Sequence, residues 1–107
     1  MIRLDWLQHM TKSRLHEFSE HAFDECEDER ITAADIESAI LNGEILEQYE
    51  QRRHPRGDSC LVLGPRVGGG YVHVVLSKGR PEGEMRVVTA YLPRPPQWID
   101  KRRRGAR

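Results

Sequence analysis

The sequence predicts an α+β domain in which N-terminal helices cover one face of a three- to four-stranded antiparallel sheet. Apolar residues first recur at helical spacing, up to about residue 42, and then change to the alternating or continuous runs of strands. Segments containing glycine or proline separate these runs, as turns do in a meander. The length of 107 residues suits one domain. We expect that domain over residues 1–100, with a basic tail over residues 101–107.

The first two helices are predicted from apolar spacing and a cap. Over residues 2–11, apolar side chains lie four positions apart from Ile2 onward, which places them on one helix face. A second helix is expected over residues 20–29, because Ser19 is a favoured N-cap residue and small apolar side chains follow at helical spacing.

The third helix has the strongest local signals. Thr32 is a favoured N-cap residue, and Asp35 follows three positions later, where an acidic side chain can complete a capping box. Asn42 and Gly43 are typical of a helix end. We therefore expect a helix from residue 33 to residue 42.

The remainder of the chain has strand character in four runs, at residues 44–49, 60–63, 71–77 and 85–92. The glycine-rich stretch 64–70 is interpreted as a hairpin turn, because a strand follows it and the Gly-Lys-Ser/Thr sequence of a phosphate-binding loop is absent. In the run 71–77, alternation places His73 on the face opposite the core. Prolines end the last run, and Trp98 is expected to dock back onto the body.

Charge is distributed unevenly, although the formal net charge is zero. Residues 17–50 carry 12 acidic residues against one basic residue, and residues 51–107 carry 13 basic residues against 4 acidic ones. A basic half can attract phosphates or an acidic partner. Alternatively, the two halves neutralise each other within the fold, and the sequence leaves both interpretations open.

Cellular context is predicted from what the chain contains. It has no apolar stretch long enough to span a membrane, and its first residues lack the apolar core of a signal peptide. Cys26 and Cys60 form no Cys-x-x-Cys pair and are expected to be reduced packing residues. These features favour a cytoplasmic protein with no membrane partner.

The stretch HEFSEH at residues 16–21 resembles a zinc protease motif only superficially. That motif needs histidines four positions apart, whereas His16 and His21 are five apart. At roughly 100° per residue, five positions separate them by about 140° around a helix, too far for one ion. We predict no metal and no other cofactor.

Four polar residues are candidates for catalysis: His21, His73, Thr89 and Tyr91. If the last two strands pair through their short turn, His73 can approach Thr89 or Tyr91 across the ladder. An imidazole, a hydroxyl and a phenol near cations suffice for RNA cleavage without a metal, because a base, an acid and a charge stabiliser are then present. A structural role in the sheet explains the same residues, since threonine and tyrosine are favoured in strands.

Cations expected to contact RNA are Arg52 and Arg53 in a basic loop, Arg86 in the last strand, and Lys101 at the start of the basic tail. Solvated segments are the alternative interpretation of the loop and the tail.

Ordered motifs along the chain resemble a bacterial family known as domain of unknown function 4258. They are SEHA at 19–22, RITAADIESAILNGEILEQY at 30–49, CLVLG at 60–64, YVHVV at 71–75, VVTAYLP at 87–93 and PPQW at 95–98. Together they cover about residues 15–104. No motif alone is diagnostic, but their order and spacing are fairly specific.

The resemblance implies both a fold and a function. The family is similar to RelE/ParE-like ribonuclease toxins, which have helices packed on an antiparallel sheet and cleave RNA without metal. By position, their functional residues correspond to His21, His73, Thr89 and Tyr91. The implied partners are an RNA substrate and a small cognate antitoxin, in some cases of zinc-finger type. A second copy of the chain is a further possible partner.

The chain departs from that family where basic residues usually follow the helix histidine. Those places hold Glu25 and Glu29, whose negative charge repels phosphate. Two interpretations follow. Either the protein is a toxin whose cations come from elsewhere, such as Arg86 or Lys101, or it is a non-catalytic protein-interaction module of the same fold that has lost nuclease activity.

Overall fold

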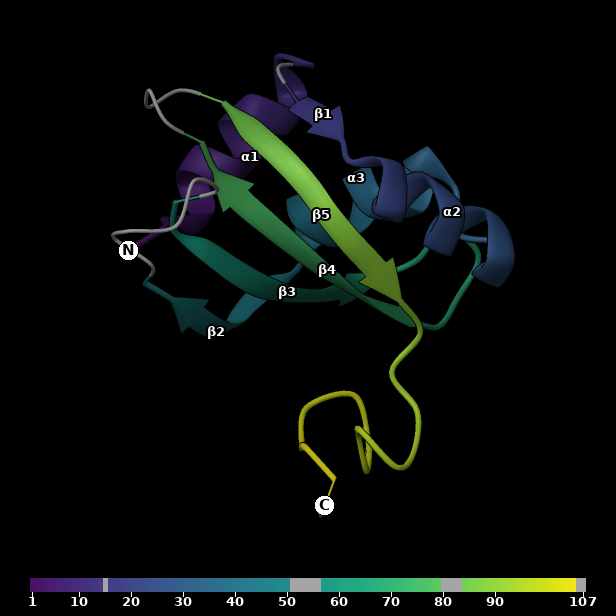
Figure 1. Ribbon diagram of the computed structural model, residues 1–107. Coiled ribbons are helices and arrows are strands. Elements are labelled where there is room, and N and C mark those ends of the chain that lie inside the picture. Colours follow the sequence, from purple (N-terminus) through teal and green to yellow (C-terminus); the bar gives the residue numbers. More distant parts are fainter. Residues whose placement is uncertain (15, 51–56, 80–83, 106–107) are drawn as a thin grey trace.

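The computed structural model in Figure 1 describes residues 1–14, 16–50, 57–79 and 84–105 and has an α+β architecture. The helices are α1 (Leu4–Lys12), α2 (Glu20–Glu29) and α3 (Ala33–Asn42). The strands are β1 (His16–Phe18), β2 (Glu44–Tyr49), β3 (Ser59–Pro65), β4 (Tyr71–Lys78) and β5 (Met85–Tyr91). All three predicted helices and all four predicted strands are confirmed, with boundaries shifted by at most two residues.

The sheet differs from the predicted three- to four-stranded antiparallel one. Its five strands have the order β1-β5-β4-β3-β2, and β1 pairs with β5 in parallel. The prediction of a purely antiparallel sheet is therefore wrong at this edge. A strand of three residues has too few positions to show alternation, so its sequence carries no strand signal. The other neighbours are antiparallel, as expected.

Two local caps position α2. The Ser19 hydroxyl accepts a hydrogen bond from the Ala22 amide at 3.0 Å and donates one to the Val88 carbonyl at 2.8 Å, which attaches the helix start to β5. The helix ends at Arg30, whose left-handed backbone (φ 57°) is a conformation that favours glycine. The chain can therefore turn directly into the next helix.

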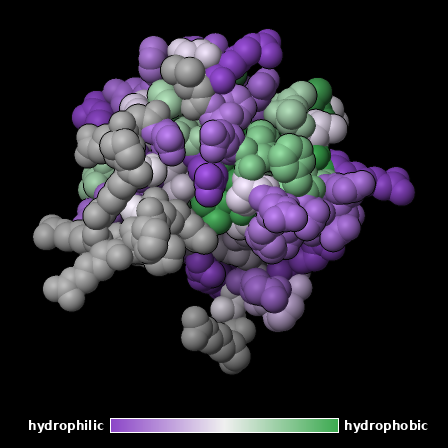
Figure 2. All heavy atoms as spheres, turned by 45° about the horizontal axis from the view of Figure 1, so that its top comes forward, coloured by the Kyte–Doolittle hydropathy of each residue, from purple (hydrophilic) through white to green (hydrophobic). Residues whose placement is uncertain are grey.

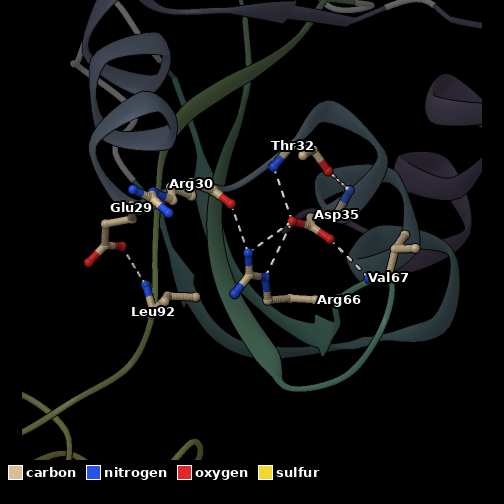
Figure 3. Close-up of polar contacts among 7 residues, drawn as sticks. All are labelled: Glu29, Arg30, Thr32, Asp35, Arg66, Val67 and Leu92. Carbon is tan, nitrogen blue, oxygen red and sulfur yellow. Dashed lines mark hydrogen bonds and ion pairs between the residues drawn. The ribbon is translucent and has the colours of Figure 1, made fainter.

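The capping box predicted for α3 is present and extends into a larger network (Figure 3). The Asp35 carboxylate accepts hydrogen bonds from the amides of Thr32 at 3.0 Å and Val67 at 2.9 Å. It also forms an ion pair with Arg66 at 3.2 Å. Arg66 in turn donates to the Arg30 carbonyl at 2.8 Å. One buried carboxylate therefore joins the start of α3 to the turn between β3 and β4.

The principal core lies between the helices and one face of the sheet. Buried residues of α1 and α3 meet Cys60, Val62, Val72, Val74 and Leu76 from the central strands. This is the face predicted from alternation in β4. Both cysteines are buried free thiols that form no disulfide with each other.

The backbones of α3 and β3 approach each other closely at Gly64. A side-chain carbon added to Gly64 would overlap the carbonyl oxygen of Ala39. We expect Gly64→Ala to lower the free energy of unfolding by about 1–3 kcal/mol, because the helix must move away from the strand. Urea denaturation measures this, and unchanged stability would contradict the close approach.

The opposite face of the sheet is covered by the C-terminal segment (residues 93–105), which leaves β5 and folds into a compact loop in Figure 1. Trp98 docks as predicted, is 2% exposed and meets the His73 ring. Leu63, which lies opposite His73 in the strand register, and Leu61 are buried as well. Within the segment, the Gly105 amide donates to the Gln97 carbonyl at 2.8 Å. The sheet therefore has a second, smaller core.

The face of the molecule seen in Figure 2 carries many hydrophilic side chains, with an apolar patch among them. Large hydrophobic side chains that are exposed include Phe23 and Val67. No helix in the described ranges combines the length and apolar character needed for a membrane span.

Candidate functional site

His73 and Tyr91 form a pair on the face of the sheet away from the helices. They lie opposite each other in the β4–β5 register. The Nδ1 atom of His73 is 3.2 Å from the Tyr91 hydroxyl, and the two rings meet edge to face with centroids 5.2 Å apart. The predicted approach of these two residues is therefore present in the structure.

The second imidazole nitrogen determines the proton positions. Nε2 of His73 lies 2.7 Å from the carbonyl oxygen of Lys101. A carbonyl oxygen can only accept, so we assign the hydrogen to Nε2, and Nδ1 then accepts the hydrogen bond from the Tyr91 hydroxyl. Burial lowers the pKa of His73, although the Lys101 carbonyl and the charge of Glu47 act in the opposite direction. The imidazole is accordingly neutral at pH 7.

Tyr91 connects this pair to a pocket. Burial raises the pKa of Tyr91, so its phenol stays protonated at neutral pH. The pocket has a volume of about 380 Å³ and lies between α2, the end of β5 and the C-terminal segment. It is lined by Glu25, Glu29, Tyr91, Leu92, Arg94, Gln97, Trp98 and Arg104. This size is typical of a small-molecule site.

Both carboxylate oxygens of Glu29 accept hydrogen bonds from within the protein. Its carboxylate accepts a hydrogen bond from the Leu92 amide at 2.6 Å, a contact visible in Figure 3, and one from Arg94 at 2.7 Å. These bonds connect the end of α2 to the end of β5, residues more than sixty positions apart in the chain. Glu29 therefore orients Arg94 at the pocket.

Arg104 also lines the pocket. It donates to Glu47 at 2.6 and 2.9 Å, and its guanidinium lies 4.6 Å from the centre of the Trp98 ring. The hydrogen bond from Arg104 is the main reason that the pKa of Glu47 is lowered. This ion pair fixes the C-terminal segment to β2.

His21 and Thr89 are less closely connected to the pair. His21 is in the first turn of α2, with a side chain 67% exposed, and its Nε2 lies 3.6 Å from Glu25. Because Glu25 lines the pocket, His21 stands beside it. Thr89 shares a sheet face with Tyr91 and lies opposite Val75. Among the described residues, no hydrogen bond joins the Thr89 hydroxyl to His73 or Tyr91.

The predicted RNA-binding cations are spread over the surface. Arg86 lies near the start of β5 and pairs with Glu17 at 3.4 Å. The Lys101 ammonium lies 3.8 Å from the centre of the Tyr71 ring, while its carbonyl holds His73. Arg52 and Arg53 lie outside the described residues. Arg94 was not singled out from the sequence, and Arg104 was predicted only as part of the basic tail, since nothing local distinguishes the two pocket arginines from other arginines.

The two histidines of HEFSEH belong to different elements, His16 to β1 and His21 to α2. Within the part of the chain that the structure describes, no group of three or more histidine, cysteine or acidic side chains could hold a metal ion.

Comparison with known families identifies the family of the chain. Residues 18–92 match a family described as Domain of unknown function (DUF4258). Searches of curated proteins and of solved structures find no match for the chain. The match includes α2, α3 and strands β2 to β5 and leaves the C-terminal segment outside. The chain belongs to the DUF4258 family.

Proposed function

We propose that the protein is an RNA-cleaving toxin. It is an endoribonuclease that needs no metal ion, and it cleaves RNA in the pocket beside Tyr91. The observation that carries the proposal is the Tyr91–His73 hydrogen bond, which connects a phenol on the pocket wall to a neutral, buried imidazole. This arrangement suits a proton relay, because the imidazole can receive the phenol proton while the phenol oxygen takes one from the substrate.

In the proposed reaction, the 2′-hydroxyl of a nucleotide attacks the adjacent phosphorus. Tyr91 takes the hydroxyl proton while its own proton passes to Nδ1 of His73. His21, in its protonated form, gives a proton to the departing 5′-oxygen. The products are a 2′,3′-cyclic phosphate and a 5′-hydroxyl end, and proton exchange with water restores both histidines.

His73 takes part from behind Tyr91 rather than by touching RNA. Its side chain has no exposed surface, so only Tyr91 can meet the substrate. The Lys101 carbonyl holds the Nε2 hydrogen and would stabilise the imidazolium that forms. The negative charge of Glu47 favours the same charged form. His73 thus positions Tyr91 and temporarily accepts its proton.

Arg94 and Arg104 are the proposed stabilisers of the phosphorane. Each side chain is more than half exposed at the pocket. A guanidinium has five N–H donors, so some remain beyond those given to Glu29 and Glu47. Preorganised donors of this kind typically supply the largest part of a rate enhancement. Thr89 receives no proton-transfer role in this scheme.

The toxin assignment rests on the resemblance to RelE/ParE-like toxins. The same resemblance supports a RelE-like fold, a cytoplasmic location, and a small cognate antitoxin as partner.

A second candidate function is a non-catalytic protein-interaction module. The observation that favours it is the pairing of cations with carboxylates: Arg94 with Glu29, Arg104 with Glu47, and Arg86 with Glu17. Such pairing weakens the attraction of an RNA backbone. In this interpretation the His73–Tyr91 bond only stabilises the sheet.

Two experiments test the proposal. The protein is expressed in bacteria and growth is followed, and the purified protein is incubated with RNA in the presence of EDTA. We expect growth arrest and RNA cleavage, with cyclic phosphate ends. Tyr91→Phe keeps the ring but removes the proton carrier, so cleavage should slow by about 100-fold or more. His73→Gln should have a similar effect.

Tyr71→Phe is the matched control, because Tyr71 is a partly exposed tyrosine on the same sheet, and this variant should cleave like the wild type. RNA left intact by the wild-type protein, together with harmless expression, would favour the interaction module instead.

A further inference from the structure

We propose that the pocket selects guanine and that Glu25 is the residue that recognises it. This inference rests on the proposed function, since the guanine would belong to the RNA held beside Tyr91. It also gives a role to a negatively charged residue that general phosphate binding does not explain.

The two glutamates of the pocket differ in how their oxygens are used. Both oxygens of Glu29 accept strong hydrogen bonds from the protein. Among the described residues, Glu25 makes one ion pair, an exposed one with His21 at 3.6 Å, and no hydrogen bond through its carboxylate. Such a pair is weak. Glu25 therefore presents a carboxylate with unused acceptor capacity, 35% exposed, in the wall of a pocket.

The chemistry of a carboxylate matches one base edge. Guanine carries two adjacent donors, N1–H and the 2-amino group, which can meet both oxygens of one carboxylate. Cytosine and adenine each offer an amino group beside an acceptor nitrogen, and uracil offers one N–H between two carbonyls. A carboxylate thus gains two charge-assisted bonds only with guanine and faces a repelling acceptor on the other bases.

Single-stranded RNA exposes this edge, because unstacked bases present their Watson–Crick side to proteins. The pocket also has a place for the phosphate of the same nucleotide. Glu25 and Glu29 are four residues apart on α2, which is about 6 Å along the helix, and Glu29 holds Arg94. A base at Glu25 and a phosphate at Arg94 therefore lie on neighbouring parts of one pocket.

The first test compares cleavage of short RNAs that differ at one position. We expect an RNA with guanosine to be cleaved roughly fivefold to a hundredfold faster than one with inosine, which lacks the 2-amino group. Glu25→Gln should reduce this ratio to near one, because an amide offers one acceptor and one donor. Glu27→Gln is the control, as Glu27 lies exposed on the same helix outside the pocket, and it should keep the wild-type ratio.

The second test is independent of cleavage and measures binding of guanosine and inosine monophosphates by NMR chemical-shift titration. We expect tighter binding of the guanosine nucleotide and loss of that preference in Glu25→Gln. Cleavage with equal guanosine and inosine rates would overturn the specificity and leave the nuclease proposal intact. Selective binding without cleavage would support the guanine site and reject the nuclease. Equal binding of both nucleotides by the wild-type protein would overturn the inference.

Discussion

Trp98→Ala is expected to lower the free energy of unfolding by about 3–5 kcal/mol. The indole is 2% exposed and meets the His73 ring edge to face at 4.3 Å. It also supports the Arg104 guanidinium on its face. Removal leaves a cavity over the centre of the sheet and loosens the C-terminal segment. Urea denaturation followed by circular dichroism measures the loss.

The same substitution should change how stability depends on pH. Burial holds the pKa of His73 below its usual value of 6.5. The unfolded chain therefore binds a proton at this site at a higher pH than the folded protein does, and the wild-type protein loses stability as the pH falls below about 6.5. In Trp98→Ala the imidazole is more exposed, so its pKa should rise and this acid-dependent loss should shrink.

Ile99→Ala is the matched control, because its side chain is 57% exposed next to Trp98. It should change stability by no more than about 0.5 kcal/mol. If Trp98→Ala were equally mild, the second core beneath the C-terminal segment would contribute little to the fold.

Asp35→Ala is expected to cost about 2–4 kcal/mol of unfolding free energy. The substitution removes the acceptor of two amide hydrogen bonds and the partner of Arg66 at once. The Asp35 side chain is only 4% exposed, so water cannot replace these bonds without rearrangement. Thermal and urea unfolding measure the effect, with Glu37→Ala on the same helix as the control.

Acid should reproduce part of this loss in the wild-type protein. Burial alone would raise the pKa of Asp35, but hydrogen bonds from Thr32, Val67 and Arg66 together lower it. A carboxyl with a lowered pKa contributes stability above its unfolded value near 3.8, and that contribution disappears as the pH falls through the folded value. Asp35→Asn should lack this acid-dependent component. Identical acid sensitivity in the variant would show that other carboxyl groups account for it.

Features that depend on near neighbours in the sequence were predictable. The caps at Ser19 and Thr32 use atoms three residues away, and alternation in β4 determines which of its side chains enter the core. β1 was not predictable, because its three residues are a strand only through pairing with β5, almost seventy positions later. Its sequence favours no structure by itself.

The candidate site likewise has a part that could be predicted from the sequence and a part that could not. His73 and Tyr91 could be brought together from strand pairing alone, and the structure places them opposite each other. The pocket could not be predicted, because its walls come from α2, the end of β5 and the C-terminal segment, which are distant in the sequence. Bonds such as Glu47–Arg104, 57 positions apart, depend on the complete fold. Which cations are neutralised by carboxylates is therefore a property of the tertiary structure.

The C-terminal segment also sets the order in which the two faces of the sheet can be covered during synthesis on the ribosome. Residues 93–105 follow His73 by at least twenty positions in the chain, yet Trp98 and the Lys101 carbonyl contact its ring. At about 5–20 residues per second, that ring remains open to water, and to other nascent chains, for several seconds. The helical side of the sheet can assemble before the C-terminal segment is made, whereas the other side must wait for that segment.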